Sequence, residues 1–191
     1  PIWIASRENT NRSNLINQIL ADYVSMMTPE KRIDNIFKSI EEFFADSTDL
    51  VPFLSPGSMS MSMKSSLQYK YRPTIKYSVQ LYRVPENAIG ELNVIFRTRS
   101  APLLAELTDF FRMWKKLEDT YISEHYRPGA ISYELQENRL VRTIALPTDR
   151  NYTNRELADA ICGYIEMFDE LLKGYLAGEH SPAKLEERYV E

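Results

Sequence analysis

Residues 59–81 read MSMSMKSSLQYKYRPTIKYSVQL, and this stretch decides the fold. Nearly every odd position is apolar or aromatic, whereas the even positions are polar. A period of two is typical of a strand with one buried face. Pro73 cannot donate to a strand ladder, so we predict two strands, at 58–71 and 74–84. The methionines could instead belong to the preceding loop.

The segments that follow extend the sheet. After the turn PENAIG, apolar and polar residues alternate again and predict a third strand at 89–99. The stretch ISYELQENRLVRTIAL reads as a hairpin with its turn at Glu137 and Asn138, and its second strand ends at Pro147. These strands follow one another in meanders and hairpins, so we expect a mainly antiparallel five-stranded sheet.

Four further segments have the spacing of long amphipathic helices. In these segments apolar residues recur at intervals of three and four, and we predict helices at 13–27, 29–45, 101–122 and 154–176. Thr28 and Ser100 each stand just before a helix with an early proline, and TNRE from Thr153 is a capping box. The helices therefore begin at recognisable caps.

Together these elements predict an α+β fold. Its order is strand, strand, strand, helix, strand, strand, helix, preceded by an N-terminal helical segment. We divide the chain into a helical arm or hairpin at 1–50, an α+β domain at 51–178 and a polar C-terminal tail at 179–191. The segment 46–57, with two prolines, is read as a loop. The helices offer more apolar surface than one face of the sheet covers, so we expect a homodimer.

The composition is that of an ordinary soluble globular protein. The 191 residues are 43% hydrophobic and 26% charged, with a net charge of −4. No apolar run approaches the ~18 residues that a membrane-spanning helix needs. The opening PIWIA is too short for the core of a signal peptide, and one cysteine with two histidines favours a reducing compartment. We expect a cytoplasmic protein.

Motifs that carry chemistry are missing from the sequence. It has no phosphate-binding glycine loop, GxSxG, HExxH or CxxC. Cys162 lies beside Ile161 on an apolar helix face and is interpreted as a core residue, and His125 suits a helix C-terminus electrostatically. We therefore predict no catalytic residue, no cofactor and no metal site.

One segment differs in charge from the rest of this acidic chain. Residues 64–99 contain seven Lys or Arg and two Asp or Glu. The alternation places several of these cations opposite the apolar face of the sheet. The predicted partner-binding residues are Lys70, Arg72, Lys76, Arg97 and Arg99. The alternative is a solvated sheet face that binds nothing.

The order of elements resembles a known layout. Helix, three strands, helix, hairpin, helix is similar to the type III secretion chaperones and the related YbjN family, over about residues 30–177. The most similar stretch is ISYELQENRLVRTIALPTDRNYTNRELADAICGYIEMFDELL, where a hairpin ending in a Leu-Pro turn leads into a capped helix. The chain departs from this layout by an extra N-terminal helix and the SMSMSM segment. The resemblance implies a homodimeric, non-enzymatic protein that holds an extended segment of a partner.

Three functions follow as hypotheses. The first is a chaperone-like or adaptor-like protein-binding module that uses a hydrophobic or strand-edge groove. The second is a nucleic-acid-associated protein that uses the basic segment with Tyr69 or Tyr82. The third is a small-molecule-binding protein or enzyme whose site is assembled from dispersed residues.

Overall fold

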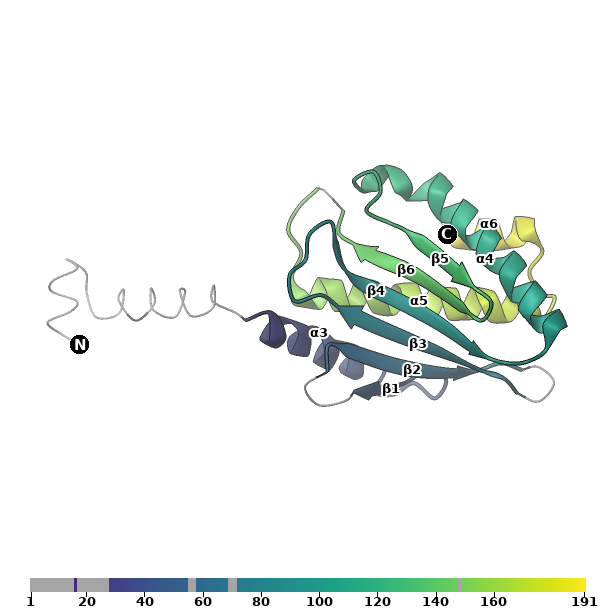
Figure 1. Cartoon of the computed structure of the whole chain (residues 1–191), viewed down its shortest axis with the longest axis horizontal. Coiled ribbons are helices and arrows are strands. Elements are labelled where there is room, and N and C mark those ends of the chain that lie inside the picture. The colour runs from purple at the N-terminus through teal and green to yellow at the C-terminus, as the bar shows by residue number, and fades with distance from the viewer. Residues whose placement is uncertain (1–15, 17–27, 55–57, 69–71, 148) are drawn as a thin grey trace, which may run out of the picture.

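The computed structural model describes residue 16 and residues 28–54, 58–68, 72–147 and 149–191. Within these residues the fold is α+β, as predicted, and a helix precedes the sheet (Figure 1). The helices are α3 (Pro29–Phe43), α4 (Ala101–Tyr121), α5 (Asn154–Leu176) and α6 (Pro182–Val190), with a short 3-10 helix, η1 (Ser123–His125), after α4. The strands are β1 (Val51–Leu54), β2 (Ser60–Ser66), β3 (Thr74–Leu81), β4 (Ala88–Arg97), β5 (Tyr133–Gln136) and β6 (Arg139–Ala145). The helix predicted at 13–27 lies outside the described residues, apart from residue 16.

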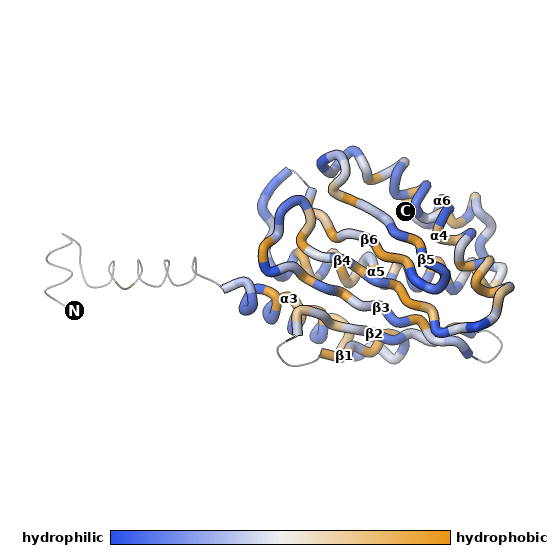
Figure 2. Tube along the Cα trace, viewed as in Figure 1, coloured by the Kyte–Doolittle hydropathy of each residue, from blue (hydrophilic) through white to orange (hydrophobic). Residues whose placement is uncertain are grey.

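The described strands form one antiparallel sheet in the order β1-β2-β3-β4-β6-β5. The period of two is confirmed, because Met61, Met63, Ile75, Tyr77 and Val79 are all fully buried. Met61 and Met63 therefore belong to β2, whereas Met59 lies in the bend just before it. Figure 2 shows the corresponding alternation of hydropathy along the strands.

The predicted number of strands is wrong, since the described part of the sheet has six and not five. The additional strand is β1, which lies in the segment read as a loop. It pairs with β2 from Val51 opposite Lys64 to Leu54 opposite Met61. Four residues are too few to show an alternation of apolar and polar side chains, and a proline such as Pro52 is unfavourable inside a sheet. A proline is tolerated there because β1 lies at the edge of the sheet.

The predicted polar tail is also corrected, because residues 182–190 form α6. The Ser181 hydroxyl accepts a hydrogen bond from the Lys184 N–H at 3.3 Å, and Pro182 occupies the first turn. Leu185 is fully buried, and the Tyr189 ring lies 5.2 Å from that of Trp114. The Ser-Pro start, with apolar residues four apart, is the signal that the sequence reading missed.

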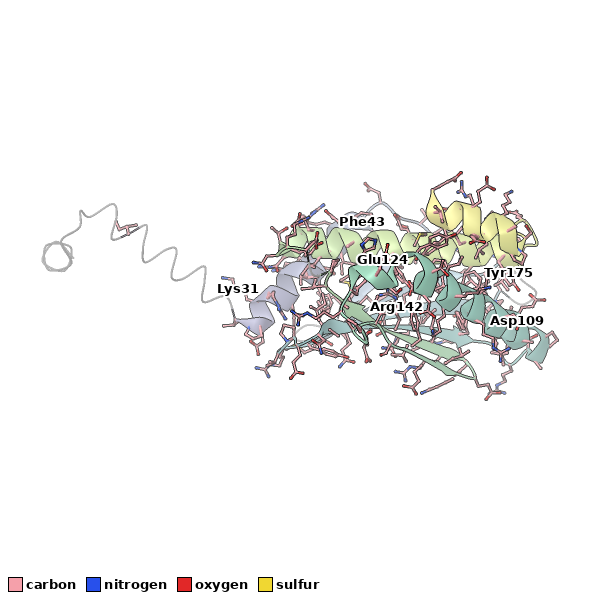
Figure 3. All side chains as sticks on the ribbon, turned by 90° about the horizontal axis from the view of Figure 1, so that it is seen from above. Lys31, Phe43, Asp109, Glu124, Arg142 and Tyr175 are labelled. Carbon is pink, nitrogen blue, oxygen red and sulfur yellow. The ribbon has the colours of Figure 1, made fainter. Side chains whose placement is uncertain are left out.

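All of the described helices pack on one face of the sheet (Figures 1 and 3). An aromatic cluster joins them to it. The Phe168 ring of α5 lies 4.8 Å from Trp114 and 5.5 Å from Phe110 of α4, and 6.1 Å from Tyr77 of β3. Helix α3 shares this core through Ile33, Ile36, Phe37 and Ile40. Helix α3, which the sequence analysis assigned to an N-terminal arm, thus packs in the same core as the α+β domain.

A buried carboxylate on α5 accepts hydrogen bonds from the sheet. Asp169 is 4% exposed and accepts hydrogen bonds from the Ser65 hydroxyl at 3.0 Å and the Tyr77 hydroxyl at 2.8 Å. The Lys173 ammonium lies 2.6 Å from the same carboxylate and neutralises it. Burial, followed by the Asp169 charge, raises the pKa of Tyr77 well above its usual value, so this phenol stays a donor.

The contact between β3 and β4 generates a test of the register. Gly90 lies at the register shift of β4, and a Cβ there would come within 2.1 Å of the Gln80 carbonyl oxygen. We expect Gly90→Ala to lower the free energy of unfolding by about 1–3 kcal/mol, because backbone must move.

Gly163 provides the matched control, since it lies inside α5 with open space at its Cβ position. Gly163→Ala is expected to raise the free energy of unfolding by about 0.5–1 kcal/mol. Urea denaturation of both variants measures the difference, and equal effects of the two changes would contradict the register.

Candidate functional site: the open face of the sheet

The face of the sheet opposite the helices gathers the basic side chains. Directly paired residues of an antiparallel sheet project on the same side. One row across β2, β3, β4 and β6 consists of Lys64, Lys76, Ile95 and Arg139. The next row along consists of Ser66, Thr74 and Arg97. These two rows contain no acidic residue, and we call Lys64, Lys76, Arg97 and Arg139 the basic face.

Lys64 and Lys76 oppose each other directly across β2 and β3. Like charges at opposed positions destabilise a sheet. None of the ion pairs among the described residues includes either lysine. The Lys64 ammonium instead lies 5.1 Å from the centre of the Phe53 ring, as a cation–π contact. A bound anion would relieve the repulsion between the two lysines.

Apolar side chains border the basic face. Val51 and Phe53 of β1 are 44% and 52% exposed, and they pair with Lys64 and Ser62 of β2. Ile95 is half-buried and lies between Lys76 and Arg139 in the same row. The surface therefore offers both cations and apolar contact to a partner.

Acidic character is found toward the other end of the strands. Glu91 pairs with Gln80 and Thr143, two rows away from Lys76. Its carboxylate accepts hydrogen bonds from the Tyr82 hydroxyl at 3.3 Å and the Asn93 amide at 3.0 Å. Burial and then the Glu91 charge raise the pKa of Tyr82. The charge on the open face therefore changes along the strands, from basic near Lys76 to acidic near Glu91.

The five predicted partner-binding residues are partly brought together. Lys76 and Arg97 belong to the basic face. Arg72 and Arg99 are exposed and lie in the chain just before β3 and just after β4, beside the row that contains Arg97. Lys70 lies outside the described residues.

The prediction omitted two members of the basic face, Lys64 and Arg139. Arg139 comes from a segment with an acidic overall balance, and it reaches this surface only because β6 pairs with β4. Its Nε donates to Asn93 Oδ1 at 2.7 Å, which orients the guanidinium on the open face. Only the long-range strand order could have placed Arg139 there.

Both edges of the described sheet are short. β1 and β5 have four residues each, and β1 contains Pro52. Short edges and proline are features that limit the addition of another strand. The geometry therefore favours the face of the sheet over a strand-edge groove.

A second polar cluster is buried between the sheet and the helices. Arg142 of β6 donates from Nε to Glu118 of α4 at 2.8 Å, and the Tyr133 hydroxyl donates to the same carboxylate oxygen. The guanidinium lies 4.5 Å from the centre of the Tyr164 ring, and Trp114 Nε1 donates to the Tyr164 hydroxyl at 2.9 Å. Figure 3 shows Arg142 between the strands and the helices. This cluster connects β6 to α4 and α5.

Cys162 and His125 are candidates for a nucleophile or a metal ligand among the described residues, and their surroundings do not favour either role. Cys162 is fully buried, and burial raises the pKa of its thiol to about 12, so the thiol stays protonated and unreactive. His125 lies in η1 with an exposed side chain beside Glu124. In the described ranges no three His, Cys, Asp or Glu side chains are grouped so that they could hold a metal ion.

No protein-family model, curated protein or solved structure matches the chain. The resemblance to the type III secretion chaperones and the YbjN family therefore stays a prediction. None of the helices in the described part of the chain has the length and apolar character that crossing a membrane requires.

The Glu118–Arg142 pair generates a stability prediction. Both side chains are almost fully buried. Arg142→Leu leaves a buried carboxylate without its cation, and we expect it to lower the free energy of unfolding by about 3–5 kcal/mol. The double variant Glu118→Leu with Arg142→Leu removes both charges and should recover most of that loss.

The exposed pair of Lys38 and Asp34 on α3 is the matched control. Lys38→Leu should change the free energy of unfolding by less than about 1 kcal/mol. Urea denaturation compares the three variants, and a double variant as unstable as Arg142→Leu alone would contradict the pairing.

Proposed function

We propose that the protein is a non-enzymatic, chaperone-like or adaptor-like module that holds an extended acidic segment of another protein on its basic face. The observation that carries this proposal is the pair of rows with four cations and no acid, on a face that no described helix covers. Complementary charge would steer the segment to this face and fix its position there.

The geometry of the rows suggests how such a segment lies. Neighbouring strands are roughly 4.8 Å apart, so Lys76 and Arg139, two strands from each other, are separated by roughly 10 Å along their row. An extended peptide that crosses the strands advances about 3.3 Å per residue. Because only every second side chain of an extended peptide points to the same side, acidic residues two or four positions apart, separated by roughly 7 or 13 Å, would face this row of cations.

Protein is favoured over nucleic acid for two reasons. The chain has a net charge of −4, which opposes general attraction to a polyanion. The cations are also interleaved with apolar side chains, and the Tyr82 hydroxyl, which the nucleic-acid hypothesis needs, is bonded to Glu91 at the acidic end. Tyr69 lies outside the described residues.

We also propose a cytoplasmic homodimer, as the sequence and the family resemblance predict. The argument from surplus apolar helix surface no longer supports the dimer for α3, α4 and α5, because their apolar faces are buried in the core. The proposal of a dimer therefore rests on the resemblance.

A charge-reversal experiment tests the proposed function. The full chain with Lys64→Glu, Lys76→Glu and Arg97→Glu is compared with the wild type for capture of partners from the native cell, followed by association rates with each identified segment. We expect acidic segments to bind the wild type and to associate at least about tenfold more slowly with the variant, while the melting temperature changes little.

The matched control is Lys116→Glu, Arg127→Glu and Lys184→Glu, three exposed cations outside the basic face. It carries the same change in net charge and should bind like the wild type. An equal decrease of the association rate in both triple variants would show a general effect of net charge. An unchanged association rate in both variants would show that the basic face is only solvated and binds no partner. Recovery of nucleic acid in place of protein would favour the alternative.

A further inference from the structure

A pocket opens on the helix side of the same sheet. Its volume is about 280 Å³, near the lower end for small-molecule sites. The walls are mostly aliphatic, with Leu92 on β4, Ile144 on β6, and Leu157 and Ile161 on α5. Residues of the connecting loops and of α6 complete the lining, which includes four tyrosines, Tyr126, Tyr152, Tyr164 and Tyr189. Ala160 of α5, which is exposed, also lines the pocket, so solvent can reach it.

One end of this pocket is polar. Arg142 lines it and is 7% exposed. Its Nε is bonded to Glu118 and its Nη1 donates to the Thr143 carbonyl oxygen at 3.0 Å. The hydrogen bonds of this guanidinium to described residues use Nε and Nη1, and Nη2 is not among the buried polar atoms that lack a partner, so it keeps contact with solvent. A ligand oxygen at this end of the pocket could accept from the guanidinium in place of water, whereas a purely apolar ligand would remove the water without replacing its hydrogen bond.

The charges around this end favour a neutral oxygen. Glu118 already neutralises Arg142, and a second carboxylate would be repelled by the first. Tyr164 also lines the pocket, and burial raises its pKa well above the usual value, so the phenol adds no charge. A cationic ligand would be repelled by Arg142 itself.

We infer that this pocket binds an uncharged, mostly apolar small molecule that carries one hydroxyl or carbonyl oxygen, placed against Arg142. The aliphatic walls surround the apolar body, and the guanidinium donates to the oxygen. This site is independent of the basic face, because it lies on the opposite side of the sheet.

Four eight-carbon probes test the inference on the full chain: 2-octanone, 1-octanol, octanoate and octylammonium. The fluorescence of Trp114 reports binding, because its indole N–H donates a hydrogen bond to the hydroxyl of Tyr164, a residue that lines the pocket. At pH 7 the ketone and the alcohol should change its fluorescence saturably, with affinities at least about tenfold higher than those of the two ions. Calorimetry measures the same affinities directly.

Variants separate this site from non-specific uptake. Ala160→Phe fills the pocket and should abolish binding of the neutral probes, whereas Ala105→Phe, at an exposed alanine of α4 outside the pocket, should bind like the wild type. The double variant Glu118→Leu with Arg142→Leu should bind 2-octanone about tenfold more weakly, because one hydrogen bond is lost.

Three results would overturn the inference. These are the absence of saturable binding by both neutral probes, tighter binding of octanoate than of 1-octanol, and unchanged binding in Ala160→Phe. Melting curves of each variant confirm that the comparison is made between folded proteins.

Discussion

The packing of Phe168 against Trp114, Phe110 and Tyr77 is the contact on which the rest of the structure depends. It joins two helices to the centre of the sheet, and one face of β2, β3, β4 and β6 contributes buried residues to the same core. The polar groups that this places inside must then be paired, as Asp169 is with its neighbours. The opposite face is left to water or to a partner, and its side chains are correspondingly polar and charged.

The period of two along the strands gives the sheet two surfaces of different chemistry. On β6, Arg142 faces the helices beside the apolar pocket, while Arg139 faces outward with the basic face. On β4, Leu92 lines the pocket and Ile95 lies between two cations of the basic face, Lys76 and Arg139. A protein segment and a small apolar molecule would therefore bind on opposite sides of the same strands without competing for any residue.

Most of the fold could be predicted from periodicity and caps. The alternation at 59–81 and the helix starts at Thr28, Ser100 and Thr153 identified elements whose burial depends on local pattern alone. β1 and α6 were missed because both are short and take their stability from contacts with distant residues, as Leu185 does in the core. The candidate site was predicted in part: charge pattern identified Lys76 and Arg97, but Arg139 required the pairing of β4 with β6, which no local signal encodes.

The central claim is that the open face of the sheet is free in the isolated chain and is covered by an acidic segment. Paramagnetic relaxation of isoleucine and valine methyl groups by a soluble spin label measures this directly, with and without a captured partner segment. We expect strong relaxation of Ile95 and Val51 in the free protein, little relaxation of the buried Ile75 and Val94, and protection of Ile95 on binding. Relaxation of Ile95 that the bound segment leaves unchanged would contradict it.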